Sequence, residues 1–330
     1  MWVNLSGAVQ EHWKDVAVFH SYKEFGEDNN VSPDSLPQPF NTPDVVVFEG
    51  FYHIETIKIS RQLRKKNIPY IIVPRGSLTR QAMNNHAWLK KRLAHLLYFD
   101  SYCRHAAAIQ YLTEQERNDA YRRWCKHNFV IPNGFNPPAT TKTDFSTDGM
   151  KMVFVGRPDA YHKGLDVLWE AIAATQSEMR KAHVTLDFYA PKNNGDWARL
   201  QQETVDKRID DIVIMHDKIG GKDKETALLQ ADVFVLTSRF EGHPMGLVEA
   251  LAYGLPALVT PGSNMAREIR AYNAGWVTEC NPKALANTLL SLVKDKETLK
   301  VKGQNALRLS TNYNWDTIAK LFHEQLVKVL

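Results

Sequence analysis

The sequence predicts an α/β protein built from two doubly wound domains, each a parallel sheet with helices on both faces. Nine short apolar, β-branched runs recur along the chain between segments with helical periodicity. Most of these runs are continuous rather than alternating, which is typical of strands buried on both faces of a parallel sheet. The 330 residues also exceed the length of one ordinary domain, so two sheets fit better than one.

The predicted strands fall into two groups separated by a linker. The first group lies at residues 45–48, 70–73, 107–112 and 129–131. The second group lies at residues 152–155, 184–189, 212–215, 233–236 and 257–260. Between them, residues 132–138 are rich in Pro, Asn and Gly, and a polar stretch follows them. We therefore expect a first domain over residues 1–136 and a second over 137–312.

Three helices are predicted with clear apolar faces, at residues 163–174, 282–293 and 315–329. The last of them carries Trp315, Ile318, Phe322 and Leu326 on one face. Because that face needs a partner, we expect residues 313–330 to dock back on the first domain. The stretch 24–43 contains many turn formers and predicts a long irregular loop inside the first domain.

Composition and charge narrow the class of protein. With 44% hydrophobic and 24% charged residues, the chain is neither disordered nor fibrous. Its 41 Lys and Arg against 37 Asp and Glu give a net charge of +4, too small a surplus to indicate nucleic acid binding. An anionic small molecule or an anionic membrane surface remains compatible with this charge. The three cysteines are widely spaced and lack metal-binding spacing, which favours reduced thiols in the cytoplasm.

No targeting or membrane-spanning segment is expected. Residues 1–7 lack the basic and apolar regions of a signal peptide. No run approaches the roughly 18 apolar residues that a membrane helix needs. We therefore expect a cytoplasmic protein whose membrane contact, at the inner face of the plasma membrane, is at most peripheral.

The segment that follows the predicted strand 233–236 carries two notable carboxylates. Glu241 lies in the loop beyond the carboxyl end of that strand, where open α/β sheets bind ligands. Pro244 suits the first turn of a helix, and the free amides from Met245 to Leu247 would then bind an anion without a metal. Glu249 lies among apolar residues and can accept two hydroxyl hydrogen bonds, as from a ribose diol. The alternative is that both carboxylates are ordinary solvated charges.

A second loop, after the predicted strand 152–155, carries two cations. Arg157 offers a planar fork of donors and Lys163 a compact point charge. This pair suits the two phosphates of a departing nucleoside diphosphate. The alternative is a surface turn that happens to contain two basic residues.

Together these segments resemble the retaining glycosyltransferases of GT-B fold, family 4, over roughly residues 45–325. The matching positions are the acidic pair Glu241 and Glu249, Gly156-Arg157, Lys163-Gly164, Pro132-Asn133-Gly134 and the returning helix around Tyr313-Asn314-Trp315. In addition, Pro74-Arg75-Gly76 looks like an element found in members that build capsular or surface polysaccharides. The fold that this resemblance implies is GT-B, with two Rossmann-like domains facing across a cleft.

The resemblance also implies roles for individual residues. The second domain would bind the donor, with Arg157, Lys163 and Glu241 as catalytic residues. The donor-binding residues would be Gly156, Gly242, His243, Met245, Gly246, Leu247 and Glu249. Of these, the amides of Gly246 and Leu247 would face phosphate and Glu249 would hold the ribose. The first domain would bind the acceptor, with Arg75 and Gly76 at the cleft. Glu49 and His53 lie at the end of a predicted strand; they either line the acceptor side of the cleft as well or are ordinary polar loop residues.

The implied reaction is metal-independent transfer of a sugar, with retention, from a nucleotide diphosphate sugar to a hydroxyl of a lipid-linked glycan. Fixed cations and helix amides can stabilise the departing diphosphate, so no metal and no cofactor are expected. The base stays open between uridine, guanosine and adenosine. The alternative function is a nucleotide-sugar-binding partner subunit without turnover. A dinucleotide-dependent dehydrogenase and a P-loop nucleotidase are excluded because their glycine motifs are absent.

Residues 88–99 combine apolar and basic side chains on one predicted helix. We expect an ordinary helix packed on the sheet; the alternative is contact with an anionic bilayer. Arg61, Arg64, Lys65 and Lys66 form a second basic patch that could make such a contact.

Overall fold

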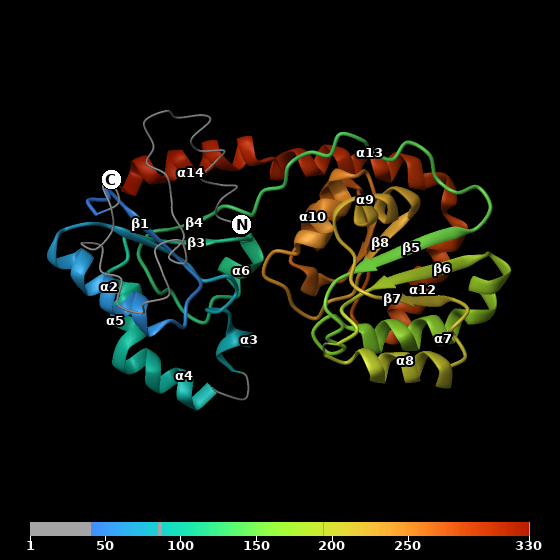
Figure 1. Ribbon diagram of the computed structural model, residues 1–330, viewed down its shortest axis with the longest axis horizontal. Helices are drawn as coiled ribbons and strands as arrows, with labels where there is room; N and C mark the ends of the chain where they lie inside the picture. Colours follow the sequence, from blue (N-terminus) through green and yellow to red (C-terminus); the bar gives the residue numbers. More distant parts are fainter. Residues whose placement is uncertain (1–40, 85–87, 194, 330) are drawn as a thin grey trace. The chain divides into compact units, whose positions relative to one another are not determined.

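The computed structural model describes residues 41–84, 88–193 and 195–329. The loop predicted at residues 24–43 and the amino-terminal residues 1–7 therefore lie almost entirely outside the described residues. The chain divides into two compact units (Figure 1). One contains the described residues up to Gly134 together with those from Asn314 on, and the other is Phe135–Tyr313. Each unit has its own parallel sheet, which confirms the predicted α/β class.

The first unit contains a four-stranded parallel sheet in the order β1-β2-β3-β4. Its strands are β1 (Val46–Glu49), β2 (Tyr70–Val73), β3 (Ala108–Tyr111) and β4 (Asn128–Val130). Its helices are α2 (Ile54–Lys65), α3 (Arg80–Met83), α4 (Trp88–Ala94), the π-helical turn η3 (His95–Phe99), α5 (Asp100–Arg104) and α6 (Glu114–Asn118). A largely aromatic cluster that includes Phe51, Tyr70, Phe99 and Tyr102 forms the main core of this unit. Each predicted strand of the first half is thus present, with its ends shifted by at most one residue.

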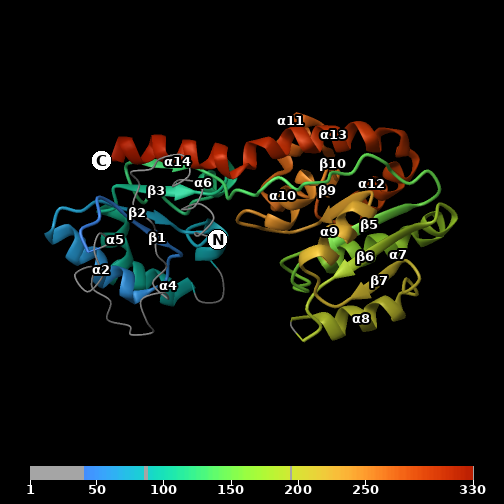
Figure 2. The ribbon, with the colours of Figure 1, turned by 45° about the horizontal axis from the view of Figure 1, so that its top comes forward.

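The last helix, α14 (Trp315–Val329), completes the first unit (Figure 2). Its Trp315 and Phe322 pack with Ile71 and Ile131 of the sheet in a second, separate core cluster. A Cβ at Gly134 would lie 2.5 Å from the Trp315 ring, so only glycine fits at this position. The chain passes between the units at two neighbouring points, because the Phe135 amide donates to the Tyr313 carbonyl at 2.7 Å.

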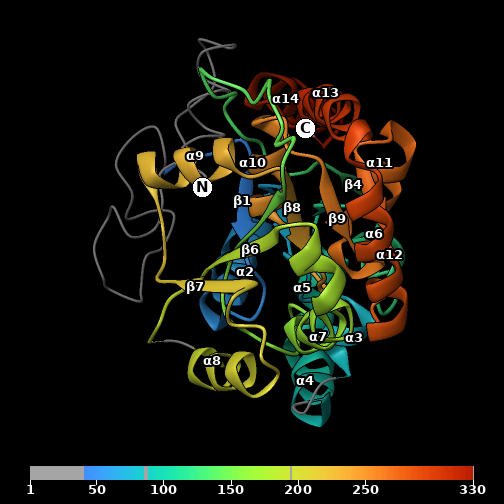
Figure 3. The same cartoon turned by 90° about the vertical axis from the view of Figure 1, so that its right-hand side faces the viewer.

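The second unit contains a six-stranded parallel sheet in the order β10-β9-β8-β5-β6-β7. The strands are β5 (Met150–Val155), β6 (Val184–Tyr189), β7 (Val213–His216), β8 (Val233–Leu236), β9 (Ala257–Val259) and β10 (Gly275–Val277). The helices are α7 (Leu165–Lys181), α8 (Trp197–Asp206), α9 (Gly221–Gln230), α10 (Met245–Ala252), α11 (Ala266–Tyr272), α12 (Pro282–Lys294) and α13 (Leu299–Ser310), and the 3-10 turns are η4 (Pro261–Ser263), η5 (Lys296–Thr298) and η6 (Thr311–Tyr313). Helix α7 packs with α12, and α10 packs with α13, so helices cover both faces of the sheet (Figure 3).

The strand order of the second unit brings the loops that follow β5 and β8 together at one edge of the sheet. From β5 the chain moves through α7 to β6 on one side of the sheet, whereas from β8 it moves through α10 to β9 on the other. Strands β5 and β8 are neighbours and parallel. Their carboxyl ends therefore form a topological switch point, which is where open α/β sheets bind ligands.

Candidate active site

Two loops meet at this switch point through an ion pair. Lys163, in the loop after β5, lies with its Nζ 2.5 Å from Oε1 of Glu241, in the loop after β8. Ser238 donates its hydroxyl to the same oxygen at 2.6 Å. The two charged side chains are only 13% and 9% exposed, so they form a well-shielded pair rather than two solvated surface charges. The structure thus brings together two of the three predicted catalytic residues.

The backbone of the first loop is fixed against β8. Thr237 donates its hydroxyl to the carbonyls of Lys163 and Gly164, at 3.0 and 3.2 Å. Gly164 caps α7 with φ +62°, a left-handed conformation that glycine adopts without strain. A Cβ at Gly164 would lie 2.1 Å from the Thr237 carbonyl oxygen. Glycine at this position therefore lets the Lys163 backbone approach the strand end closely.

A second ion pair, which the sequence analysis missed, also joins the two loops. Arg239 donates two parallel hydrogen bonds to the Asp166 carboxylate, at 2.7 and 2.8 Å, and its amide donates to the His162 carbonyl at 2.9 Å. Burial acts to raise the pKa of the Asp166 carboxyl, but the hydrogen bonds and charge of Arg239 outweigh it and hold that pKa below its usual value. The His162 ring stacks on Phe240 with 4.2 Å between centroids. Burial lowers the pKa of His162, which favours the neutral ring.

The start of α10 supplies the predicted helix amides, with one correction. Pro244 is the residue before the helix, and the amides of Met245 and Gly246 make no hydrogen bond with any described residue. The Leu247 amide, in contrast, donates to the Pro244 carbonyl at 3.0 Å. It is already used inside the first turn, so it is not one of the free amides expected here. A Cβ at Gly246 would lie 3.2 Å from the Val155 carbonyl oxygen, which explains a small residue here.

Glu249 lies on the same helix and pairs with Lys224 of α9. The two side chains are 20% and 24% exposed, so Glu249 is not a freely solvated helix residue. No spacing in the sequence links Lys224 to Glu249, and this partner could not be predicted. Asn264 holds the loop that contains Gly242, because its Nδ2 donates to the carbonyls of Glu241 and Gly242.

His243 packs at the edge of this loop, with its ring 5.4 Å from the Tyr313 ring. Gly156 follows β5 directly, and a Cβ there would lie 2.9 Å from the Phe154 ring. Both predicted positions therefore belong to the same loop cluster at the carboxyl edge of the sheet.

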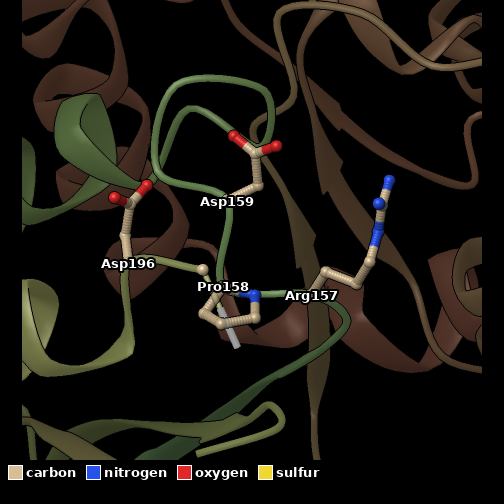
Figure 4. A pocket seen from close by; sticks show the side chains of 5 residues that line it. Arg157, Pro158, Asp159 and Asp196 are labelled. Atoms are coloured by element: carbon tan, nitrogen blue, oxygen red, sulfur yellow. The ribbon is translucent and has the colours of Figure 1, made fainter. Parts of the chain in front are cut away.

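Arg157 lines a hollow beside the first loop, with Pro158, Asp159, Gly195 and Asp196 (Figure 4). Both carboxylates are occupied by backbone amides: Asp159 accepts from His162 at 2.9 Å, and Asp196 accepts from Ala160 at 2.8 Å. The Arg157 side chain points away from Asp196 (Figure 4). Its exposed guanidinium makes no hydrogen bond or ion pair with any described residue. It is therefore available to an anionic ligand.

The predicted acceptor-side residues gather at strand ends of the first unit. Arg75 and Gly76 adopt left-handed conformations, with φ +50° and φ +81°. Arg75 pairs with Glu49 at the end of β1. The turn is held by Glu116, which accepts from the Gly76 amide and, at 2.7 Å, from the Leu112 amide. Glu116 is almost fully buried and was missed, because one Glu after a predicted strand gives no signal of its own.

His53 lies at the amino end of α2, just after β1. Its carbonyl accepts from the Thr56 hydroxyl at 2.7 Å. A Cβ at Gly50 would lie 3.1 Å from the His53 ring, so the ring folds back over the turn that ends the strand.

The described residues contain neither a cluster suited to a metal ion nor a helix suited to crossing a membrane. No three His, Cys, Asp or Glu side chains in residues 41–84, 88–193 and 195–329 are grouped so that they could hold a metal ion. Within the same ranges, no helix has both the length and the apolar character needed to cross a bilayer.

The two parallel sheets and the loops at the switch point of the second define a GT-B glycosyltransferase architecture. Residues 139–308 match the family of glycosyl transferases group 1, and the chain belongs to this family. Membership confirms the predicted class of transferase.

Known proteins similar to this chain agree with that family. WcaL of Salmonella typhimurium, named as a colanic acid biosynthesis glycosyltransferase, is 30% identical over 147 residues, which are 42% of this chain and 35% of WcaL. The chain thus matches about a third of the length of this relative. Sucrose-phosphate synthase from Thermosynechococcus elongatus superposes with TM-score 0.71 at 18% identity, covering 87% of this chain and 73% of that one. HepE from Anabaena, solved with UDP and glucose, superposes with TM-score 0.68 at 17% identity, covering 86% of this chain and 78% of that one. These structures confirm the GT-B fold.

Proposed function

We propose that this chain is a retaining, metal-independent glycosyltransferase of family 4. It transfers a sugar from a nucleotide diphosphate sugar to a hydroxyl of a lipid-linked glycan in the synthesis of a capsular or other surface polysaccharide. The reaction takes place in the cytoplasm, at the inner face of the plasma membrane. The observation that carries the proposal is the shielded contact between Lys163 and Glu241 at the switch point, with the unengaged Arg157 in the same loop as Lys163.

The charges at this site suit a departing diphosphate. Breaking the bond between sugar and phosphate leaves negative charge on the diphosphate and positive charge on the anomeric carbon. Lys163 and the free amides of Met245 and Gly246 are held in place before the reaction, and together with the unengaged Arg157 they can stabilise the growing negative charge. The incoming hydroxyl gives its proton to an oxygen of the departing diphosphate. The site therefore needs no separate general base.

Glu241 links phosphate and sugar recognition in this proposal. One of its oxygens accepts from both Lys163 and Ser238, which holds the carboxylate in a single orientation. Its second oxygen can then accept from a hydroxyl of the donor sugar. The contact with Glu241 also holds the Lys163 side chain in place for the diphosphate.

Glu249 holds the ribose in the same arrangement. Lys224 binds one of its carboxylate oxygens, Oε2, and thereby fixes the side chain. The other oxygen can accept from a ribose hydroxyl. Lys224 becomes a positioning residue for nucleotide binding.

The relatives support two parts of the proposal. The name of WcaL refers to colanic acid, a polysaccharide, which agrees with a role in polysaccharide synthesis. HepE was solved with UDP and glucose, which agrees with a nucleotide diphosphate sugar as donor.

A thermal-shift panel tests donor binding first. UDP, GDP, ADP and their common sugar conjugates are each added to the full chain, because a ligand that binds the native state raises Tm. We expect one nucleotide to raise Tm at concentrations where the other two do not. A flat response to all of them would contradict the proposal. Turnover of the identified donor, followed as release of nucleoside diphosphate, then separates an enzyme from a binding subunit.

A further inference from the structure

Helix α4 and the turn η3 expose an apolar stripe that the rest of the described chain does not cover. Leu89, Leu93, Leu96 and Leu97 are between 55% and 75% exposed, and Trp88 and Tyr98 beside them are nearly half exposed. Helix α4 buries none of its residues. The expectation of an ordinary packed helix is therefore wrong for residues 88–94. This stripe contrasts with the single exposed apolar residues that every protein surface carries.

The four leucines form one continuous face. Their spacing of i, i+4, i+7 and i+8 places them on one side of a helix. The opposite side anchors the segment, since His95 and Phe99 of η3 are buried against Phe51 in the aromatic core. The leucines are thus presented outward by a firmly held segment (α4 is at the lower left of Figure 1).

Cations border the stripe. Residues 88–99 contain Lys90, Lys91 and Arg92 but no Asp or Glu. Lys90 and Arg92 are exposed, and Arg92 lies over the ring of Trp88 with 4.9 Å to its centroid. Asp100, the first carboxylate after the stripe, is already paired with Arg122. An exposed apolar face with a purely cationic border complements an anionic lipid surface, where leucines enter the acyl boundary and cations contact phosphates.

We propose that the stripe formed by Leu89, Leu93, Leu96 and Leu97, with Lys90 and Arg92, docks this protein on an anionic phospholipid bilayer. A second copy of the chain is disfavoured as the occupant, because two such faces would bring like charges together. The inference rests on the proposed function, since a lipid-linked acceptor has to be met at the membrane. Docking through this helix places the first unit, which contains the acceptor-side residues, at the lipid surface.

Vesicle sedimentation with the full chain tests the proposal. Vesicles of phosphatidylcholine alone are compared with vesicles of equal parts phosphatidylcholine and phosphatidylglycerol, without donor or acceptor. We expect clear binding to the anionic vesicles only. Leu93→Ser/Leu96→Ser should weaken that binding by about ten-fold or more. Lys90→Glu/Arg92→Glu, which keeps the leucines, should weaken it by at least about five-fold for each charge.

Matched controls come from α14. Leu321 and Val327 are also exposed apolar residues, each next to a lysine, so Leu321→Ser/Val327→Ser should bind as the parent does. An unchanged Tm shows that each variant is folded. If Leu93→Ser/Leu96→Ser does not fold, the binding of Lys90→Glu/Arg92→Glu alone tests the proposal.

Three results would overturn the proposal. The parent chain could fail to bind the anionic vesicles, or both α4 variants could bind them as strongly as the parent does. The third is a parent dimer in sedimentation velocity that Leu93→Ser/Leu96→Ser converts to monomer. Vesicle binding is measured without nucleotide. A negative result would therefore contradict the docking proposal but not the proposed transfer from a nucleotide diphosphate sugar.

Discussion

Lys163 and Arg157 differ in their surroundings although both are proposed to face the same diphosphate. Lys163 is shielded and shares an oxygen of Glu241 with Ser238, whereas Arg157 is exposed and unengaged. The loop positions of both cations could be predicted from the sequence, because each lies between an apolar strand and a helical segment. The contact of Lys163 with Glu241 could not be predicted from a local pattern, since the two residues are 78 positions apart and meet because of the strand order.

Replacing either cation should slow the reaction more than it weakens binding. The charge on the diphosphate grows as the bond breaks, so Lys163→Ala or Arg157→Ala should lower kcat by about 100- to 1000-fold. Steady-state release of nucleoside diphosphate measures the effect. Lys181→Ala, at the opposite end of α7, is the control and should keep the parent's kcat. A variant of Lys163 with full turnover would remove its catalytic role.

Glu249→Ala should weaken the nucleotide itself. Loss of a charged acceptor for a ribose hydroxyl costs about 1.5–3 kcal/mol of binding free energy. Calorimetry with the nucleoside diphosphate, without any sugar, measures this loss directly. Lys224→Ala should give a smaller decrease, because the carboxylate remains but is no longer oriented. Equal affinity in the parent chain and Glu249→Ala would contradict the ribose assignment.

At the scale of elements, nine of the ten strands in the described residues correspond to apolar runs in the sequence. Strand β10 was missed because its three residues begin with glycine and leave only a short apolar run. Gly275 is required there, since a Cβ would lie 1.9 Å from the Ala257 carbonyl oxygen. Helix α4 shows the opposite failure: its apolar residues suggested packing on the sheet, but the structure turns them to solvent.

The junction between β5 and α7 depends on Gly164. Alanine there would combine a left-handed backbone with a clash against the Thr237 carbonyl, so Gly164→Ala should lower the free energy of unfolding by about 2–4 kcal/mol. Gly220 is a matched control, because it also precedes a helix but has φ −158° and no atom near its Cβ position. Gly220→Ala should cost less than about 1 kcal/mol. Similar midpoints for both variants in urea denaturation would argue against the close approach.

The Arg239–Asp166 ion pair should give the second unit a pH-dependent stability. The folded pKa of Asp166 lies below its usual 3.8, so the contribution is present above that value and is lost as the pH falls through the folded pKa. Asp166→Asn should therefore lower Tm at pH 7, by the equivalent of at most about 1 kcal/mol for a partly exposed carboxylate. The difference between variant and parent should shrink as the pH falls.

Asp211→Asn serves as the control for this ion pair, because Asp211 pairs with Arg180 on a more exposed surface. Its effect on Tm at pH 7 should be smaller. A constant difference between Asp166→Asn and the parent at every pH would contradict the proposed linkage.

At the scale of the whole molecule, the first unit is built from two separate stretches of chain. The apolar face of α14 was visible in the sequence, and the structure shows that Ile71, Ala108 and Ile131 cover it. Phe322 lies fully buried at this contact. A helix distant in sequence thus completes one core cluster of the unit that contains the acceptor-side residues.

Phe322→Ala should destabilise this unit strongly. Removing a fully buried aromatic ring costs about 3–5 kcal/mol of unfolding free energy, because a cavity remains between α14 and the sheet. Val327, on the exposed side of the same helix, is the control, and Val327→Ala should change stability by less than about 0.5 kcal/mol. Urea denaturation followed by circular dichroism measures both variants. Equal midpoints would show that α14 contributes little to the core.

The position of α14 also has a consequence for biosynthesis. A ribosome makes β1 to β4 first, then all of Phe135–Tyr313, and only afterwards residues 315–329. Throughout that interval Ile71, Ala108 and Ile131 lack the contact with α14, while all the described strands and helices of the second unit have already been made. Domains usually fold as they emerge, the amino-terminal one first. Here we expect the reverse order, because the first unit cannot reach its native state before α14 is made, which gives chaperones longer access to the apolar residues that α14 covers.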